Sequence, residues 1–329
     1  MELHITGLSK TYPNGVRALD DVSLSIPTGM FGLLGPNGAG KSTLMRTLAT
    51  LQDADHGSAQ LTDAKAGTHI NVLRDKDGVR RVLGYLPQDF GLYPKVRAED
   101  MLDHLARLKG LSDRAERQNV VTTLLHQTNL YDVRRKALGG FSGGMRQRFG
   151  IAQALIGRPK LIIVDEPTAG LDPEERTRFH NLLAEIGEEV IVLLSTHIVS
   201  DVSDLCPNLA IMNKGRVLAT GTPGELTAAL AGRIWQTSAP RIEVAALRER
   251  HDVISTRLYG GRTRLHVLAD ASPGPGFEPV EATLEDAYFA AIGGHAGAAA
   301  DDAPSAMRRA DAPSAMRPAD APPTTPERR

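Results

Sequence analysis

Short apolar runs recur along the first two thirds of the chain, separated by polar and glycine-rich stretches. Residues 30–34, 161–164 and 190–194 are almost continuously apolar, whereas residues 22–26 alternate between apolar and polar positions. A continuous run is typical of a strand buried on both faces, as in a parallel sheet, and alternation is typical of a strand with one face in solvent. The pattern therefore predicts an α/β protein with a mixed sheet core and an antiparallel β subdomain.

Residues 98–129 have the period of a helix. One face of this segment carries Met101, Leu102, Leu105 and Leu108. We expect an inserted helical subdomain from about residue 95 to 157, between a strand that Pro87 ends and the apolar run at 161–164, with its last helix at 146–156. Residues 53–80 are polar and rich in Gly and Asp, which predicts an irregular antiparallel excursion.

The chain beyond residue 231 has a different pattern. Residues 253–258 and 264–268 predict two strands, and Thr283 begins a capped helix, so we expect residues 232–292 to form a small α+β accessory domain. Two alternatives stay open for this helix. It packs back onto the main domain, or it serves dimer contact or regulation.

From residue 293 the composition changes to Ala, Pro, Asp and Arg, and large apolar residues become rare. The segment Asp302–Arg308 recurs as Asp311–Arg317. Such a segment cannot bury enough apolar surface to offset the entropy of ordering it. We therefore expect residues 293–329 to be a disordered tail.

Composition narrows the classes of protein that fit these elements. The chain has 329 residues, 41% of them hydrophobic, and a formal net charge of −1, which argues against a nucleic-acid-binding surface over the whole protein. The single cysteine, Cys206, excludes an intrachain disulfide, and we expect a buried thiol in a reducing compartment. No apolar run reaches about 18 residues and no secretory signal pattern opens the chain, so we expect no membrane span and no signal peptide.

The strongest chemical signal follows the first continuous apolar run, where the chain matches G-x-x-x-x-G-K-[ST]. The matching loop and the residue after it are Gly35, Pro36, Asn37, Gly38, Ala39, Gly40, Lys41, Ser42 and Thr43. Its glycines let successive backbone N–H groups point into one concavity, and the helix that follows adds the positive end of its dipole. Lys41 supplies a charge for the β- and γ-phosphates, and Ser42 is placed to hold Mg²⁺. The loop therefore predicts nucleotide binding.

Polar residues that suit such a site end three other strands of the expected sheet. Gln88 follows Pro87, Asp165 and Glu166 follow residues 161–164, and His197 follows residue 196. The carboxyl ends of parallel strands face the ligand in open α/β sheets. Asp165 is placed to hold Mg²⁺ through its water shell, and Glu166 to orient or deprotonate an attacking water. His197 is a candidate for a γ-phosphate contact, although a lone histidine after a strand usually has a structural role.

Two further features allow more than one interpretation. Ser142, Gly143 and Gly144 open a helix, and this combination is either a second anion-binding helix end or an N-cap with a glycine hinge. Tyr12 lies beside turn residues, where its ring either stacks on a purine or packs against neighbouring side chains.

The order of these motifs resembles that of the ATP-binding cassette of ABC transporters. The resemblance covers about residues 2–230, so it implies a P-loop NTPase cassette over residues 1–231, with ATP and Mg²⁺ as ligands. It also implies residue roles: the phosphate loop from Gly35 to Thr43 holds the phosphates and Mg²⁺, Tyr12 stacks on adenine, Gln88 joins the metal to the membrane-subunit interface, Glu166 is the catalytic base and His197 senses the γ-phosphate.

The resemblance further implies a dimer in which Ser142, Gly143 and Gly144 close over ATP held by a second cassette. Asp172 would lie in the loop linking the two cassettes, and the partner would be a copy or a relative of this chain. The family's commonest signature is Leu-Ser-Gly-Gly-Gln, whereas Phe141 and Met145 take the outer positions here. This form is similar to the drug, ion and lipid exporter branch, in which the membrane subunits are separate chains.

The leading hypothesis is therefore an ATPase subunit that couples dimer closure and hydrolysis to export through a separate multi-span permease. Such a chain would be peripheral, at the cytoplasmic face of the cell membrane, with no nucleic-acid partner. One alternative is a soluble cassette ATPase that acts as a regulatory or assembly switch without transport. Another is a binding module with little turnover, against which the intact Glu166 and His197 speak. Nothing in the sequence identifies the cargo.

Overall fold

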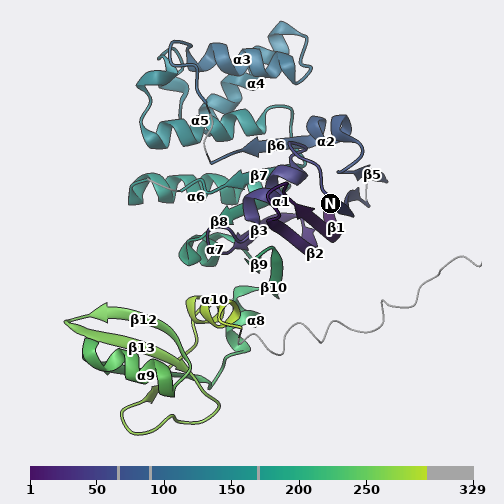
Figure 1. Cartoon of the computed structure of the whole chain (residues 1–329). Coiled ribbons are helices and arrows are strands. Elements are labelled where there is room, and N and C mark those ends of the chain that lie inside the picture. Colours follow the sequence, from purple (N-terminus) through teal and green to yellow (C-terminus); the bar gives the residue numbers. More distant parts are fainter. Residues whose placement is uncertain (65–66, 89–90, 169–170, 295–329) are drawn as a thin grey trace, which may run out of the picture.

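The computed structural model describes residues 1–64, 67–88, 91–168 and 171–294 (Figure 1). Ala169 and Gly170 lie outside these residues, within the stretch 167–172 that is expected to turn into the next helix. Residues 295–329, which are almost all of the predicted tail, also lie outside the described ranges.

A six-stranded mixed sheet forms the centre of the described chain, in the order β10-β9-β3-β8-β7-β6. Its strands are β3 (Gly29–Leu34), β6 (Leu83–Leu86), β7 (Leu161–Asp165), β8 (Ile191–Thr196), β9 (Asn208–Asn213) and β10 (Arg216–Gly221). Five of them are parallel, and β10 pairs antiparallel with β9 through a tight turn. Every residue of β7 and β8 is buried, as the continuous apolar runs predict.

A four-stranded antiparallel sheet in the order β2-β1-β4-β5 carries the N-terminus. Its strands are β1 (Glu2–Thr11), β2 (Arg17–Pro27), β4 (His56–Asp63) and β5 (Thr68–Asn71). The stretch 53–80 is more regular than predicted, because β4 extends this sheet along β1. It also leads into helix α2 (Lys76–Val82), so Val82 ends a helix and does not begin the following strand.

Helices cover both faces of the central sheet. The first face packs against α1 (Lys41–Leu48) and the antiparallel sheet in one apolar cluster. The other face packs against α6 (Pro173–Gly187), α7 (Val199–Leu205) and α8 (Pro223–Ala228) in a second cluster. Within the described ranges, no helix combines the length and apolar character needed to cross a bilayer.

The helical subdomain is inserted between β6 and β7, as predicted, and lies at one end of the molecule (Figure 1). It contains α3 (Ala98–Leu108), α4 (Arg114–Gln127), α5 (Gly143–Leu155) and two short 3₁₀ turns, η1 (Tyr131–Val133) and η2 (Leu138–Gly140). The single periodic segment is two helices, because Gly110 adopts a φ of +92° after α3 and Asp113 caps α4. Leu108 shares the expected helix face but is 70% exposed at the end of α3.

The segment after α8 forms a second antiparallel sheet at the opposite end (Figure 1). Its elements are β11 (Ile234–Ala239), η3 (Arg241–Glu243), α9 (Val244–Arg250), β12 (Val253–Tyr259), β13 (Arg262–Leu268), β14 (Glu278–Pro279) and α10 (Leu284–Ile292). The predicted strands are β12 and β13, and Thr283 caps α10 as expected. Helix α10 packs against α7 and α8, and Leu284 and Tyr288 belong to the same apolar cluster as Val202 of α7.

Candidate functional site

The phosphate loop connects β3 to α1, and glycine is required at two of its positions. A Cβ on Gly35 would come within 2.4 Å of the Met212 carbonyl oxygen. Gly40 caps α1 with a φ of +102°, and a Cβ there would lie 2.4 Å from the Ala18 carbonyl oxygen. The loop backbone therefore packs closely against the segments of Met212 and Ala18. Ser42 and Thr43 lie in the first turn of α1.

Lys41 is the buried cation of this loop, with 5% of its surface exposed. Its Nζ donates hydrogen bonds to the carbonyl oxygens of Gly35 (2.6 Å) and Pro36 (3.1 Å). Burial lowers the pKa of Lys41, and the charges of Glu166 and Asp165 offset only part of that effect. The ammonium group thus lies within the electrostatic reach of both strand-end carboxylates.

Asp165 is the last residue of β7, and it lies opposite Ser195 of β8. Its side chain is buried, and its Oδ1 atom has no hydrogen-bond partner among the residues that the structure describes. A buried carboxylate oxygen without a partner is costly unless water or a cation satisfies it. This orphaned oxygen fits a Mg²⁺ ion that keeps most of its own waters.

Glu166 follows β7 in a left-handed backbone conformation, with a φ of +46°, and its N–H donates to the Ser195 carbonyl oxygen at 3.0 Å. This turn directs the Glu166 carboxylate toward two other predicted residues. The Gln88 Nε2 donates to Oε2 at 3.3 Å, and the Nδ1 of His197 lies 3.2 Å from Oε1. The structure therefore brings Gln88, Glu166 and His197 together at the carboxyl ends of β6, β7 and β8, as predicted.

The donor set suits Mg²⁺ better than a metal held by protein ligands alone. No group of three or more His, Cys, Asp or Glu side chains among the described residues could hold a metal ion. Magnesium is usually held by one or two protein oxygens together with substrate phosphates and water. Ser42, Asp165 and Gln88 are the residues that would hold it here.

Tyr12 is tied to the phosphate loop by its hydroxyl group. That hydroxyl lies 3.2 Å from the Thr43 Oγ1 and donates to the Gln52 Oε1 at 3.1 Å. The Gln52 amide in turn donates to the Thr43 carbonyl oxygen at 2.9 Å and to the Thr47 Oγ1 at 3.0 Å. Gln52 thus fixes Tyr12 relative to the loop. Sequence reasoning missed this role, because Gln52 lies in a polar stretch outside any motif.

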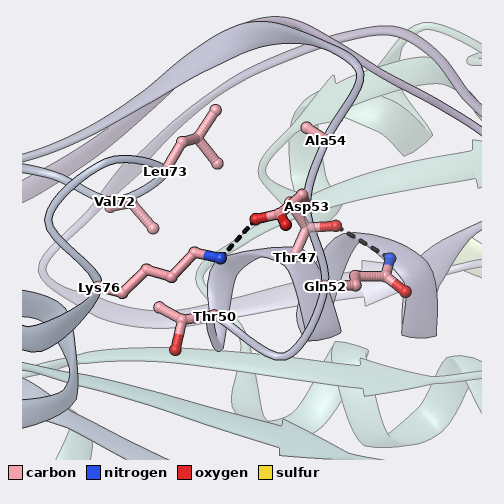
Figure 2. Close-up of a pocket in the computed structure, with 8 residues that line it drawn as sticks. All are labelled: Thr47, Thr50, Gln52, Asp53, Ala54, Val72, Leu73 and Lys76. Carbon is pink, nitrogen blue, oxygen red and sulfur yellow. Dashed lines mark hydrogen bonds and ion pairs between the residues drawn. The ribbon is translucent and has the colours of Figure 1, made fainter.

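Figure 2 shows that Gln52 and Thr47 lie beside a small cavity next to the C-terminal end of α1. The cavity is about 60 Å³ and is lined by Thr47, Thr50, Gln52, Asp53, Ala54, Val72, Leu73 and Lys76. Lys76 closes one side by an ion pair of 2.6 Å with Asp53 (Figure 2). This volume suits water molecules and is far too small for a nucleotide.

Ser142 is the N-cap of α5, and its Oγ accepts a hydrogen bond from the Met145 N–H at 3.2 Å. Gly143 and Gly144 form the first turn of that helix, which begins three residues before the predicted start at Arg146. Within the described part of the chain, no hydrogen bond joins these three residues to the phosphate loop. Ser142 therefore caps the helix, and none of the described residues of this chain's own phosphate loop contacts it.

Asp172 is the N-cap of α6, and its Oδ1 accepts a hydrogen bond from the Glu175 N–H at 2.8 Å. Its side chain is exposed, and it has no contact with the phosphate loop among the described hydrogen bonds. The first turn of α6 is linked to α5 by the ion pair of Glu175 with Arg148. Asp172 therefore lies on the surface, at the start of a helix that is fixed to α5.

Comparison with known proteins shows the family of this chain. The ABC transporter family matches residues 19–169. The ABC transporter ATP-binding protein YxlF of Bacillus subtilis is 36% identical over 225 residues, which cover 68% of this chain and 72% of the relative. The chain belongs to the ABC transporter family of ATP-binding proteins.

Other ABC proteins show the same likeness. The daunorubicin/doxorubicin resistance ATP-binding protein DrrA of Streptomyces peucetius is 36% identical over 70% of this chain and 68% of its own length. The probable multidrug ABC transporter ATP-binding protein YbhF of Escherichia coli is 33% identical over 88% of this chain, which spans only 52% of that relative. A dimeric cassette, MJ0796, bound to ADP and phosphate has a TM-score of 0.59 and 25% identity over 67% of this chain and 98% of its own.

The departure from the common ABC signature has a structural explanation. Phe141 takes the position of the usual leucine and is 4% exposed, within the apolar cluster of the helical subdomain. Its ring meets that of Phe149 edge to face, with centroids 6.2 Å apart and an interplanar angle of 85°. The larger residue therefore fills the subdomain core and leaves the Ser142 N-cap intact.

Proposed function

We propose that this chain is the ATP-hydrolysing subunit of an ABC transporter, coupling ATP-driven closure of a cassette dimer to export through a separate transmembrane permease. The observation that carries the proposal is the meeting of Gln88, Glu166 and His197 beside the orphaned Asp165 oxygen and the buried Lys41. This is the arrangement that phosphoryl transfer to water needs, with cationic, metal-holding and proton-accepting groups converging on one point.

In this proposal the phosphate loop binds the triphosphate through its backbone N–H groups, Lys41 and Thr43. The lysine would exchange its hydrogen bonds to the loop carbonyl oxygens for phosphate oxygens. Ser42 and Gln88, with Asp165 through water, would hold Mg²⁺, which would neutralise charge on the phosphates. Tyr12 packs against the adenine ring while Gln52 holds its hydroxyl end.

Glu166 acts as the base that takes a proton from the attacking water. Both of its carboxylate oxygens are already oriented, one by Gln88 and one by His197, so little reorganisation is needed when the water arrives. A carboxylate accepts hydrogen bonds, so the His197 ring contacts Glu166 through an N–H on Nδ1. The opposite ring atom, Nε2, would face the γ-phosphate and would need an N–H of its own to contact it.

The second nucleotide-binding surface is proposed to come from a partner cassette, either a copy of this chain or a relative. Ser142, Gly143 and Gly144 provide a capped helix end with free N–H groups, and Asp172 provides an exposed acid at the start of α6. Neither contacts the chain's own phosphate loop within the described residues. Each would therefore act across the interface, in a head-to-tail dimer that encloses two nucleotides.

The transport claim rests on kinship with proteins named for multidrug and daunorubicin/doxorubicin resistance. The chain would be peripheral, at the cytoplasmic face of the membrane, with the exposed Gln88 near the permease contact. A soluble switch without transport is the competing proposal, since both would bind and hydrolyse ATP.

The test is to isolate a tagged chain from its own membranes with ATP present. We expect a multi-span protein to co-purify with the wild-type chain and with Glu166→Gln. A matched sample of Lys41→Ala should show whether capture depends on the bound nucleotide. A wild-type chain that hydrolyses ATP yet never captures a membrane protein would contradict transport and favour the soluble switch.

A further inference from the structure

A buried carboxylate contacts the two segments that carry Glu166 and His197, and it belongs to none of the sequence motifs. Asp201 is in α7, and 1% of it is exposed. Its Oδ2 accepts hydrogen bonds from the Thr168 Oγ1 at 2.6 Å and the Thr196 Oγ1 at 3.4 Å. Its Oδ1 accepts from the Arg176 Nε at 2.7 Å, and the His180 Nε2 lies 3.1 Å away.

These partners come from three separate segments of the site. Thr168 lies two residues after Glu166, and Thr196 lies immediately before His197. Arg176 is on α6, one helical turn beyond its N-cap. A single carboxylate thus joins the three segments that carry the proposed base, its histidine partner and the exposed acid of the dimer interface.

The threonine contacts also act on the backbone that leads to the histidine. The Thr196 Oγ1 accepts the N–H of Ile198 at 3.0 Å, so this hydroxyl fixes the chain on both sides of His197. Arg176 additionally donates to the Ser200 Oγ at 2.9 Å, next to Asp201 itself. The segment 196–201 is therefore fixed at both ends, and Arg176 joins it to α6.

Packing alone gives no reason for an ionised group at this position. The apolar face of α7 already places Val202 and Cys206 against β3, close enough that a Cβ on Gly32 would lie 2.6 Å from a Val202 methyl carbon. Burial of a charge is costly, and an apolar replacement of a buried ion pair is often neutral or stabilising. Burial alone would raise the pKa of Asp201, yet the close contact with His180 and the hydrogen bonds from Thr168 and Arg176 outweigh it, so the pKa is lowered and the group is ionised at neutral pH.

We propose that Asp201 is a positioning residue for ATP hydrolysis: its buried carboxylate sets the placement of Glu166 and His197 relative to each other and to Asp172. This inference rests on the proposed hydrolytic function. In the described part of the chain the hydrogen bonds of Asp201 go to Thr168, Thr196 and α6 and not to the phosphate loop, so we place it outside the nucleotide contacts. Its removal should therefore slow the chemical step and leave ATP binding almost unchanged.

The experiment compares Asp201→Asn and Thr168→Val with wild type in the full chain. The threonine variant removes one 2.6 Å hydrogen bond with little change in volume, so it carries the test if Asp201→Asn does not fold. Asp270→Asn is the matched control, because Asp270 also pairs with an arginine, Arg233 at 2.7 Å, but is 86% exposed and far from the site. The readouts are kcat, KM, the Kd of a fluorescent ATP analogue without Mg²⁺, and the melting temperature.

We expect kcat to fall about 10- to 100-fold in the site variants, because small displacements of catalytic groups have effects of that size. The Kd of the analogue should change less than about twofold, and Asp270→Asn should match wild type. The double variant Asp201→Asn/Thr168→Val should lose less than the product of the single effects, because both act through one hydrogen bond. Folded site variants with wild-type kcat, or with a lowered melting temperature alone, would overturn the proposal. A wild-type chain without ATPase activity would instead overturn the proposed function itself.

Discussion

Phe141 provides a quantitative test of how the signature segment is supported. Its ring is 4% exposed and packs edge to face on Phe149, which is fully buried. Replacement of a buried phenylalanine by alanine costs about 3–5 kcal/mol, of which the aromatic pair accounts for about 0.5–1.5 kcal/mol. Phe141→Ala should therefore lower the free energy of unfolding by about 3–5 kcal/mol. Phe141→Leu, which restores the family's commoner residue, should lose only about 0.5–1.5 kcal/mol, the share of the aromatic pair.

Urea unfolding measures these values, with far-UV circular dichroism as the signal. The only tryptophan, Trp235, lies on β11 in the accessory sheet, so its fluorescence reports a region remote from Phe141. A dichroism transition that moves to lower urea while the fluorescence transition stays would locate the lost stability in the helical subdomain.

Leu108→Ala is the matched control in the same subdomain. Leu108 is 70% exposed, so its truncation should change the free energy of unfolding by less than about 0.5 kcal/mol. A loss below about 1 kcal/mol for Phe141→Ala would refute the reasoning, because it would mean that the ring is not part of the subdomain core.

Three further predictions concern other parts of the chain. Burial raises the pKa of Cys206 to about 12, so a maleimide should label the native chain at no measurable rate and the urea-unfolded chain once. Burial opposes ionisation of Asp286, but hydrogen bonds from His266 and Thr283 outweigh it and lower its pKa from 3.8. Its contribution to the free energy of unfolding is therefore full above about pH 4 and is lost as the pH falls through the lowered pKa. Asp286→Asn should lower the free energy of unfolding by about 1–3 kcal/mol at pH 7 and make it depend less on pH in acid, as measured by urea unfolding at several pH values. Gln52→Leu should weaken ATP binding about 3- to 10-fold, as measured by calorimetry, because about 1 kcal/mol of hydrogen bonding to the loop is lost; unchanged affinity would show that the tether is dispensable.

The sequence predicts best those parts of the fold that depend on neighbouring residues. The strands at β3, β7 and β8 follow from continuous apolar runs, and the phosphate loop from its glycines. The convergence of Gln88, Glu166 and His197 also follows, because each ends a strand of one parallel sheet. Here local pattern and global topology give the same answer.

The sequence predicts least where a side chain depends on partners far along the chain. Gln52 lies 40 residues from Tyr12, and Asp201 lies 33 residues from Thr168, so no local pattern links either pair. Period places Leu108 on the same face as Leu102 and Leu105, but the glycine-ended turn after it leaves that end of α3 in solvent. Period determines which residues share a face, and only tertiary packing determines how far along the helix that face is covered.

Single-turnover ATP hydrolysis with Mg²⁺ by Glu166→Gln tests most directly whether Glu166 is the base. The control is Glu185→Gln, because Glu185 is an exposed residue of α6. The amide keeps the size of Glu166 and its place between Gln88 and His197 but cannot take a proton from water. We expect the rate to fall about 10²- to 10⁴-fold. ATP affinity should be unchanged, and an ATP-dependent dimer should accumulate on size-exclusion chromatography. A Glu166→Gln variant that hydrolyses ATP at the wild-type rate would contradict the account, because the strand-end carboxylate would then not be the base.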